Sequence, residues 1–262
     1  MKLHDDFAYG WSERWQVTQQ GGGEVTRRMK ALHLALPPST QAKPPYANAQ
    51  ITDYDPAQRN FAWRPPLHLR LNAFFGQPAE QMVGTAGFGF WNFSYGIGAK
   101  GLLLPQALWF FFCAPPSDMP LALNVPGTGW KAATFDARNW RFLALAPIAP
   151  LAFLLMRLRP ARNLLWPIGQ RAIGVHEALL DPETMVQEAT YELEWLPQRA
   201  IFRVNGQVVQ DIPVNIRQPL GFIAWIDNRW AVVTPWGHFA FGTTAPPHNQ
   251  ILVLSHVSIE NM

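Results

Sequence analysis

Polar side chains that could hold or polarise a ligand recur at alternate positions of predicted strands. They are His68, Arg70 and Asn72 in one strand, Asn48 and Gln50 in the strand before it, and Asp227, which shares its side of a third strand with Trp225. If these side chains face a binding site, Arg70 and Asp227 are the catalytic candidates, because a guanidinium and a carboxylate can anchor or polarise a ligand. The alternative is a solvated sheet face, the usual position of polar residues in antiparallel strands.

Period-2 alternation predicts the strands that carry these residues. In the run 67–74, leucine and alanine occupy one side while most of the other side is polar. Similar short runs cover 32–36, 47–54, 87–93, 107–113, 188–195, 200–209, 221–230, 236–242 and 251–260, and Asn205-Gly206 is a strong hairpin signal. Strands at this spacing predict an all-β fold, an antiparallel sandwich that we treat as a single domain over 1–262.

The composition excludes several classes of protein. Hydrophobic residues make up 48% of the chain and charged residues only 15%, which excludes a disordered chain and a long coiled coil. A single cysteine, Cys113, excludes an internal disulfide. The seven histidines include no pair four residues apart, so we predict no metal site and no cofactor. Calcium is a weaker alternative, through Asp53 and Asp55 on either side of Tyr54.

Residues 137–185 interrupt the strand pattern with an apolar segment flanked by arginine. Residues 142–156 carry no charge but are shorter than the ~20 residues of a membrane-spanning helix, and Pro147 and Pro150 divide them. The segment is therefore predicted to be a partly helical insertion. Between 137 and 176 there are six arginines and no acid, whereas the rest of the chain has 15 basic and 18 acidic residues. Because the positive charge is confined to one segment, nucleic acid is not a predicted partner.

The insertion allows two interpretations. Its arginines, together with Trp140 and Trp166, favour a peripheral membrane contact through 137–171, since both residue types are enriched where anionic lipid meets water. The alternative is a helical hairpin packed over the sandwich. The first residues include no apolar leader, so we predict a cytoplasmic location with membrane association as an additional feature.

One hairpin resembles a known family. The run Tyr191–Val209, YELEWLPQRAIFRVNGQVV, resembles a hairpin of the family 16 glycoside hydrolases, and Ile251–Glu260 resembles the closing strand of that family. The resemblance implies a concanavalin A-like jelly roll, in which two curved antiparallel sheets present a ligand cleft on the concave face.

The catalytic motif that the resemblance implies does not carry over. The family places E-x-D-x-x-E on the strand after a run that Phe90–Phe93 matches, and here those three acids become Ala107, Trp109 and Phe112. No acid occurs between Glu80 and Asp118, whereas a retaining glycosidase needs two carboxyls ~5–5.5 Å apart. The resemblance also implies a calcium-binding aspartate in the closing strand, where this chain has Ser255.

These substitutions predict a cleft built from aromatic rings. Its ligand-binding residues are expected to be Trp91, Trp109, Phe112 and Trp225, with the polar residues above, and the alternative is that the rings fill the sandwich core. We therefore predict a non-hydrolytic protein that binds a hydrophobic small molecule, and the pattern leaves open whether it also isomerises or cyclises that ligand. The alternatives are a carbohydrate-binding protein with a sugar-containing ligand, and a divergent glycoside hydrolase that uses displaced carboxylates such as Asp227 and Glu194.

Overall fold

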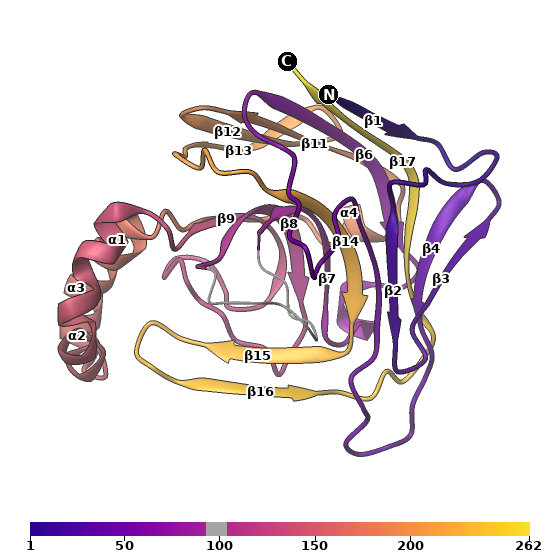
Figure 1. Ribbon diagram of the computed structural model, residues 1–262. Coiled ribbons are helices and arrows are strands. Elements are labelled where there is room, and N and C mark those ends of the chain that lie inside the picture. The colour runs from indigo at the N-terminus through magenta and orange to yellow at the C-terminus, as the bar shows by residue number, and fades with distance from the viewer. Residues whose placement is uncertain (93–103) are drawn as a thin grey trace.

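Two antiparallel sheets face one another across a hydrophobic core in the computed structural model, which describes residues 1–92 and 104–262 (Figure 1). The predicted all-β sandwich with a helical insertion is confirmed. Phe93, the last residue of one predicted strand, lies outside the described residues.

The first sheet, which we call the outer sheet, places both chain termini side by side. Its strands lie in the order β13 (Gln207–Pro213), β12 (Arg199–Val204), β11 (Ala189–Leu196), β6 (Leu67–Phe75), β17 (Gln250–Asn261), β4 (Ala31–Leu36) and β3 (Glu24–Arg28), and β1 (Lys2–Asp5) also pairs with β17. The turn between β12 and β13 is the predicted Asn-Gly turn, in which Asn205 and Gly206 both have positive φ, 51° and 78°.

The second sheet, which we call the cleft sheet, has one face in the core and the other on the outside. Its strands lie in the order β10 (His176–Leu179), β9 (Gly129–Asp136), β8 (Gln106–Cys113), β7 (Thr85–Trp91), β14 (Gly221–Asp227), β5 (Asn48–Thr52) and β2 (Gln16–Gln20). A separate hairpin of β15 (Arg229–Val233) and β16 (Phe239–Thr243) lies beside this sheet (Figure 1).

Alternation decides which side chains fill the core. In β8, Leu108, Phe110 and Phe112 are buried against the outer sheet, and in β6 the leucines at 67, 69 and 71 are fully buried. The residues between them in each strand point to the opposite face, as the pleat of a strand requires.

The helices form an arm at the edge of the cleft sheet (Figure 1). They are α1 (Trp140–Leu145), the 3₁₀ turn η2 (Ala146–Ile148), α2 (Ala149–Leu155) and α3 (Arg159–Ala172), and a proline in the first turn of η2, α2 and α3 separates each from the segment before it. The arm is shorter than the predicted 137–185, because His176–Leu179 already pairs with β9 as a strand.

Two short elements complete the described chain. They are the 3₁₀ turn η1 (Ala79–Gln81) and the helix α4 (Glu183–Val186), which lies against β6. Within residues 1–92 and 104–262, no helix combines the length and the apolarity needed to cross a bilayer.

Candidate functional site

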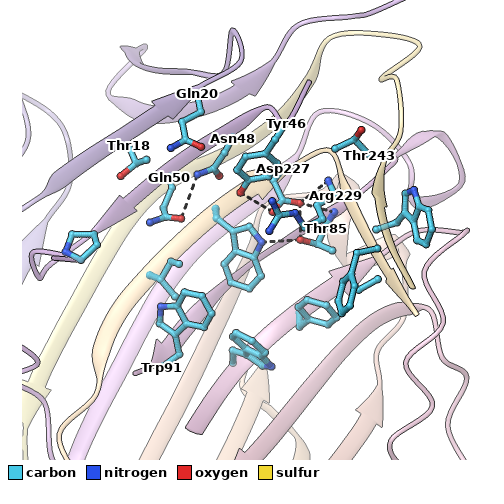
Figure 2. Close-up of a pocket in the computed structure, with 18 of the residues that line it drawn as sticks. Thr18, Gln20, Tyr46, Asn48, Gln50, Thr85, Trp91, Asp227, Arg229 and Thr243 are labelled. Atoms are coloured by element: carbon cyan, nitrogen blue, oxygen red, sulfur yellow. Dashed lines mark hydrogen bonds between the residues drawn. The ribbon is translucent and has the colours of Figure 1, made fainter. Parts of the chain in front are cut away.

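A cleft of about 730 Å³ lies on the exposed face of the cleft sheet (Figure 2). The floor comes from β2, β5, β14, β7 and β8, and the hairpin β15–β16 forms a wall. Antiparallel register places its floor residues in rows across the sheet. One row runs from Asn48 through Asp227 to Thr85, and the next runs from Gln50 through Trp225 and Gly87 to Phe111.

The part of the floor formed by β7, β8 and β14 is aromatic. The Trp109 ring stacks on Phe111, with centroids 5.4 Å apart and planes 19° apart, and it also lies 5.4 Å from Trp225 and 5.8 Å from Trp91. Glycine on β7 makes room for these rings, since a Cβ at Gly87 would lie only 3.0 Å from the Trp225 ring. The result is a continuous ring surface open to the outside.

The part of the floor formed by β2 and β5 is polar, with the side chains of Thr18, Gln20, Asn48 and Gln50 (Figure 2). Asn48 is 4% exposed, and its amide nitrogen donates to the Gln50 side-chain oxygen over 3.4 Å. Its carbonyl oxygen Oδ1 has no hydrogen-bond partner within the described residues. Because this oxygen is itself buried, Asn48 acts on the cleft surface through Gln50, whose side chain its amide nitrogen holds in place.

Among the described residues, Asp227 is the one acidic side chain that lines the cleft. Its Oδ1 accepts from the Thr85 hydroxyl at 2.9 Å and from the Arg229 backbone at 3.1 Å, and its Oδ2 accepts from the Tyr46 hydroxyl at 3.3 Å. Burial raises the pKa of Asp227 to about 6, although the Thr85 hydrogen bond opposes that shift. The carboxyl therefore changes its protonation state close to neutral pH.

Hydrogen bonds fix the rings as well as the acid. The Trp225 Nε1–H donates to the Thr85 hydroxyl at 3.0 Å, and the Trp91 Nε1–H donates to the Tyr54 hydroxyl. Arg229 lies over the Tyr46 ring, 4.2 Å from its centroid. Since buried indole N–H groups need an acceptor, these bonds hold the orientation of both tryptophans.

The structure brings six of the predicted site residues together and separates the other four. Asn48, Gln50, Trp91, Trp109, Trp225 and Asp227 all line the cleft. Phe112 does not, because the strand is regular there: it points into the core, 2% exposed, and Phe111 takes the predicted place.

His68, Arg70 and Asn72 lie on β6 of the outer sheet, on the face away from the core and outside the cleft. Arg70 pairs with Glu192 at 3.2 Å, and Asn72 accepts from the Thr190 hydroxyl at 3.1 Å. The expectation that these three side chains line the cleft is wrong, and Arg70 is no longer a catalytic candidate.

Several cleft residues escaped the sequence analysis. Tyr46 and Tyr54 flank β5 and Arg229 begins β15, where alternation gives no direction. The position of Thr85 was predictable, because it lies six residues before the predicted cleft residue Trp91 on the regular strand β7 and therefore faces the same side.

The calcium sites considered from the sequence do not fit the structure. The described residues hold no group of three His, Cys, Asp or Glu side chains arranged for a metal ion. The Asp53 carboxylate instead accepts from the Trp63 indole and the Phe222 backbone, and the Ser255 hydroxyl donates to Glu188. These oxygens are therefore already engaged within the protein.

Comparisons with known proteins identify the fold. No protein-family model and no curated protein sequence matches the chain. A prokaryotic β-1,3-1,4-glucanase (lichenase) from a mouse hindgut metagenome has a similar structure, with 12% identity, a TM-score of 0.56 and complete coverage of both chains. The endo-β-1,3(4)-glucanase SCLam of family 16 has 12% identity and a TM-score of 0.53, over 99% of this chain and 90% of SCLam.

A third similar structure is the Crh5 transglycosylase in complex with NAG, with 10% identity and a TM-score of 0.53 over 99% of this chain and 83% of Crh5. The chain therefore has the concanavalin A-like jelly-roll fold found in family 16 glycoside hydrolases, as the hairpin resemblance implied. The hypothesis of a non-hydrolytic protein for a hydrophobic small molecule is contradicted, since these three similar structures are two glucanases and a transglycosylase.

Proposed function

We propose that the cleft binds a carbohydrate chain and that the protein is a divergent relative of the glycoside hydrolases. The observation that carries this proposal is the division of the cleft floor into an aromatic half on β7, β8 and β14 and an amide and hydroxyl half on β2 and β5. A sugar ring has an apolar C–H face that stacks on aromatic rings and a rim of hydroxyls that needs hydrogen-bond partners.

An apolar ligand fits this division poorly. It would cover Gln20 and Gln50 without giving them hydrogen bonds, and a buried amide left unpaired costs about 1–3 kcal/mol. Sugar hydroxyls instead supply hydrogen-bond partners for the Thr18, Gln20 and Gln50 side chains that line this half of the cleft. The similar structures give independent support, because the lichenase and SCLam are named for β-glucans and Crh5 was solved with NAG.

A binding titration tests this proposal. We expect measurable heat of binding with oligosaccharides of at least one class among mixed-linkage β-glucan and N-acetylglucosamine oligomers. Asn48→Ala should weaken that binding, whereas Asn72→Ala should not, because Asn72 is the same residue type on the outside of the opposite sheet. Equal binding by both variants, or no binding of any oligosaccharide by the wild type, would contradict the proposal.

Hydrolysis is a second candidate function, and the position of Asp227 favours it. A carboxyl with a pKa of about 6 can donate a proton to a glycosidic oxygen near neutral pH, as general acids of glycosidases do. Two-carboxyl catalysis would need a partner, and β8 carries no acid at the positions that face the cleft. Hydrolysis here would therefore use Asp227 as the acid that protonates the leaving oxygen and a water molecule as the nucleophile, and the proton that this water releases would return to the Asp227 carboxylate.

Release of reducing ends from the bound oligosaccharide distinguishes hydrolysis from binding alone. The rate should fall as the pH rises above about 6, because Asp227 then loses the proton that it must donate. Asp227→Asn should abolish turnover while the oligosaccharide still binds. Turnover that persists in this variant would exclude Asp227 as the acid, and no turnover in the wild type would leave carbohydrate binding as the function.

A further inference from the structure

The helical arm, α1 to α3, exposes an unusual amount of apolar surface. Leu151, Leu154, Leu158, Leu164 and Ile168 are each more than half exposed, and they lie on α2, on α3 and between them. Figure 1 shows the arm projecting from the edge of the sandwich, away from both sheets. Exposed apolar surface gathered on one element typically marks a contact site.

Only one side of the arm is attached to the body of the protein. On α3, the Trp166 indole donates to the Leu121 carbonyl at 2.7 Å, and Arg162 lies 4.2 Å from the centroid of the Trp236 ring. Leu164 and Ile168 are four residues apart, so they share another side of the helix. That side faces outward, 71% and 55% exposed at these two residues, while Trp166 is buried.

The charges of the arm have a single sign. Arg141, Arg157, Arg159 and Arg171 are exposed, and no acid occurs between Asp136 and Glu177. Arg141 and Arg171 also line a groove of about 260 Å³ between α1 and α3, whose other walls are Leu145, Ile168 and Ala172. Two guanidiniums above apolar walls match the chemistry of a phosphate headgroup attached to an acyl chain.

We propose that the helical arm docks on the surface of an anionic lipid bilayer. Its exposed leucines enter the interface, and its arginines pair with lipid phosphates, with one headgroup in the Arg141–Arg171 groove. Charge complementarity favours an anionic lipid surface over a second copy of the protein, because two copies of the arm would bring like charges together. The proposal is independent of the carbohydrate cleft, because the groove and the cleft have no lining residue in common.

Vesicle sedimentation with the full chain tests this docking. The protein should sediment with vesicles of phosphatidylglycerol and phosphatidylcholine, and much less with phosphatidylcholine alone. Raising the salt from about 0.1 to 1 M should release it, because the screening length falls from about 10 to 3 Å. Replacing Arg157, Arg159 and Arg171 together by Gln should weaken binding on the order of 100-fold, since each arginine near an anionic surface contributes about fivefold.

A matched control removes the same charge elsewhere. Arg28, Lys30 and Lys43 are exposed and lie outside the arm, and changing all three to Gln should leave vesicle binding nearly unchanged. The double variant Leu154→Ser, Leu164→Ser should weaken binding without changing the melting temperature, because both side chains are exposed.

Four outcomes would overturn the proposal. Equal sedimentation with neutral and anionic vesicles would remove the role of charge, and no sedimentation with either would exclude a lipid partner. A wild-type dimer that the leucine double variant makes monomeric would identify a second copy as the occupant of the surface. Release from vesicles by millimolar inorganic phosphate at constant ionic strength would identify a free anion as the ligand of the groove.

Discussion

Trp109→Ala should weaken carbohydrate binding more than it destabilises the fold. The indole of Trp109 lies at the centre of the aromatic half of the cleft, with Phe111 and Trp225 each 5.4 Å away by ring centroids. One face of an indole is about 100 Å², and at ~25 cal/mol per Å² its loss as a stacking surface corresponds to about 2.5 kcal/mol. Binding of the oligosaccharide should therefore weaken about 60-fold.

The effect of the same change on folding should be smaller, because Trp109 is only half-buried. It loses three ring contacts, and because the ring is half in solvent each should lie near the lower end of the range of about 0.5–1.5 kcal/mol, which gives about 1.5 kcal/mol in all. Trp195 is the matched control: its side chain is fully buried, and its Nε1–H donates to the Ile216 carbonyl at 3.1 Å. Trp195→Ala should lower the free energy of unfolding by about 3–5 kcal/mol.

Urea unfolding and a calorimetric titration of each variant provide the comparison. Trp109→Ala should unfold at a slightly lower urea concentration than the wild type and Trp195→Ala well below both, whereas only Trp109→Ala should lose affinity while folded. The reasoning is refuted if folded Trp109→Ala binds the oligosaccharide as tightly as the wild type. It is refuted equally if Trp109→Ala unfolds as early as Trp195→Ala, since the ring would then belong to the core.

Three further predictions concern stability, and denaturant unfolding checks each. Burial raises the pKa of Asp227 to about 6, so between about pH 4 and 6 the folded state binds more protons than the unfolded state. The free energy of unfolding should therefore fall by about 3 kcal/mol through this residue as the pH rises across that range. Asp227→Asn should remove this part of the pH dependence and leave the similar part due to Asp53; an unchanged slope would contradict the assignment. Lys131→Met should lower the free energy of unfolding by about 3–5 kcal/mol, because it leaves the buried Glu177 carboxylate without its partner at 3.2 Å. Adding Glu177→Gln should restore most of this stability, and no recovery would mean that loss of the ion pair is not the cause. Gly87→Ala should lower the free energy of unfolding by about 1–3 kcal/mol, because the new Cβ would lie 2.3 Å from a β8 carbonyl oxygen. An unchanged free energy of unfolding would show that β8 can move aside.

Local patterns in the sequence were sufficient to predict the kind of fold. Alternation placed most of the long strands, and Asn205-Gly206 placed one turn, because both signals depend only on neighbouring residues. Prolines at 147 and 150 correctly divided the apolar segment into short helices, since proline is tolerated in the first turn of a helix and disrupts its interior. The resemblance of the hairpin at 191–209 to a family then named the jelly roll.

Alternation could not decide to which sheet a strand belongs. Gln50 and Arg70 occupy equivalent polar positions in their strands, yet Gln50 lines the cleft and Arg70 lies on the outside of the other sheet. The difference arises from pairing with distant segments, β5 with β14 and β6 with β17, so the two strands enter different sheets. Sequence pattern alone therefore left both polar faces as candidates.

Strands that are apolar on both faces carried even less information about direction. In β8 the run Trp109–Cys113 contains no polar residue, so nothing in its pattern shows whether Phe111 or Phe112 faces the cleft. Regular pairing of β8 with β7 and β9 decided it, with Phe111 outward and Phe112 in the core. The sequence by itself determined which side chains share a face of each strand, because that depends on the pleat. Only the tertiary structure decided which face meets the core, because burial depends on backbone hydrogen bonds between strands far apart in the chain.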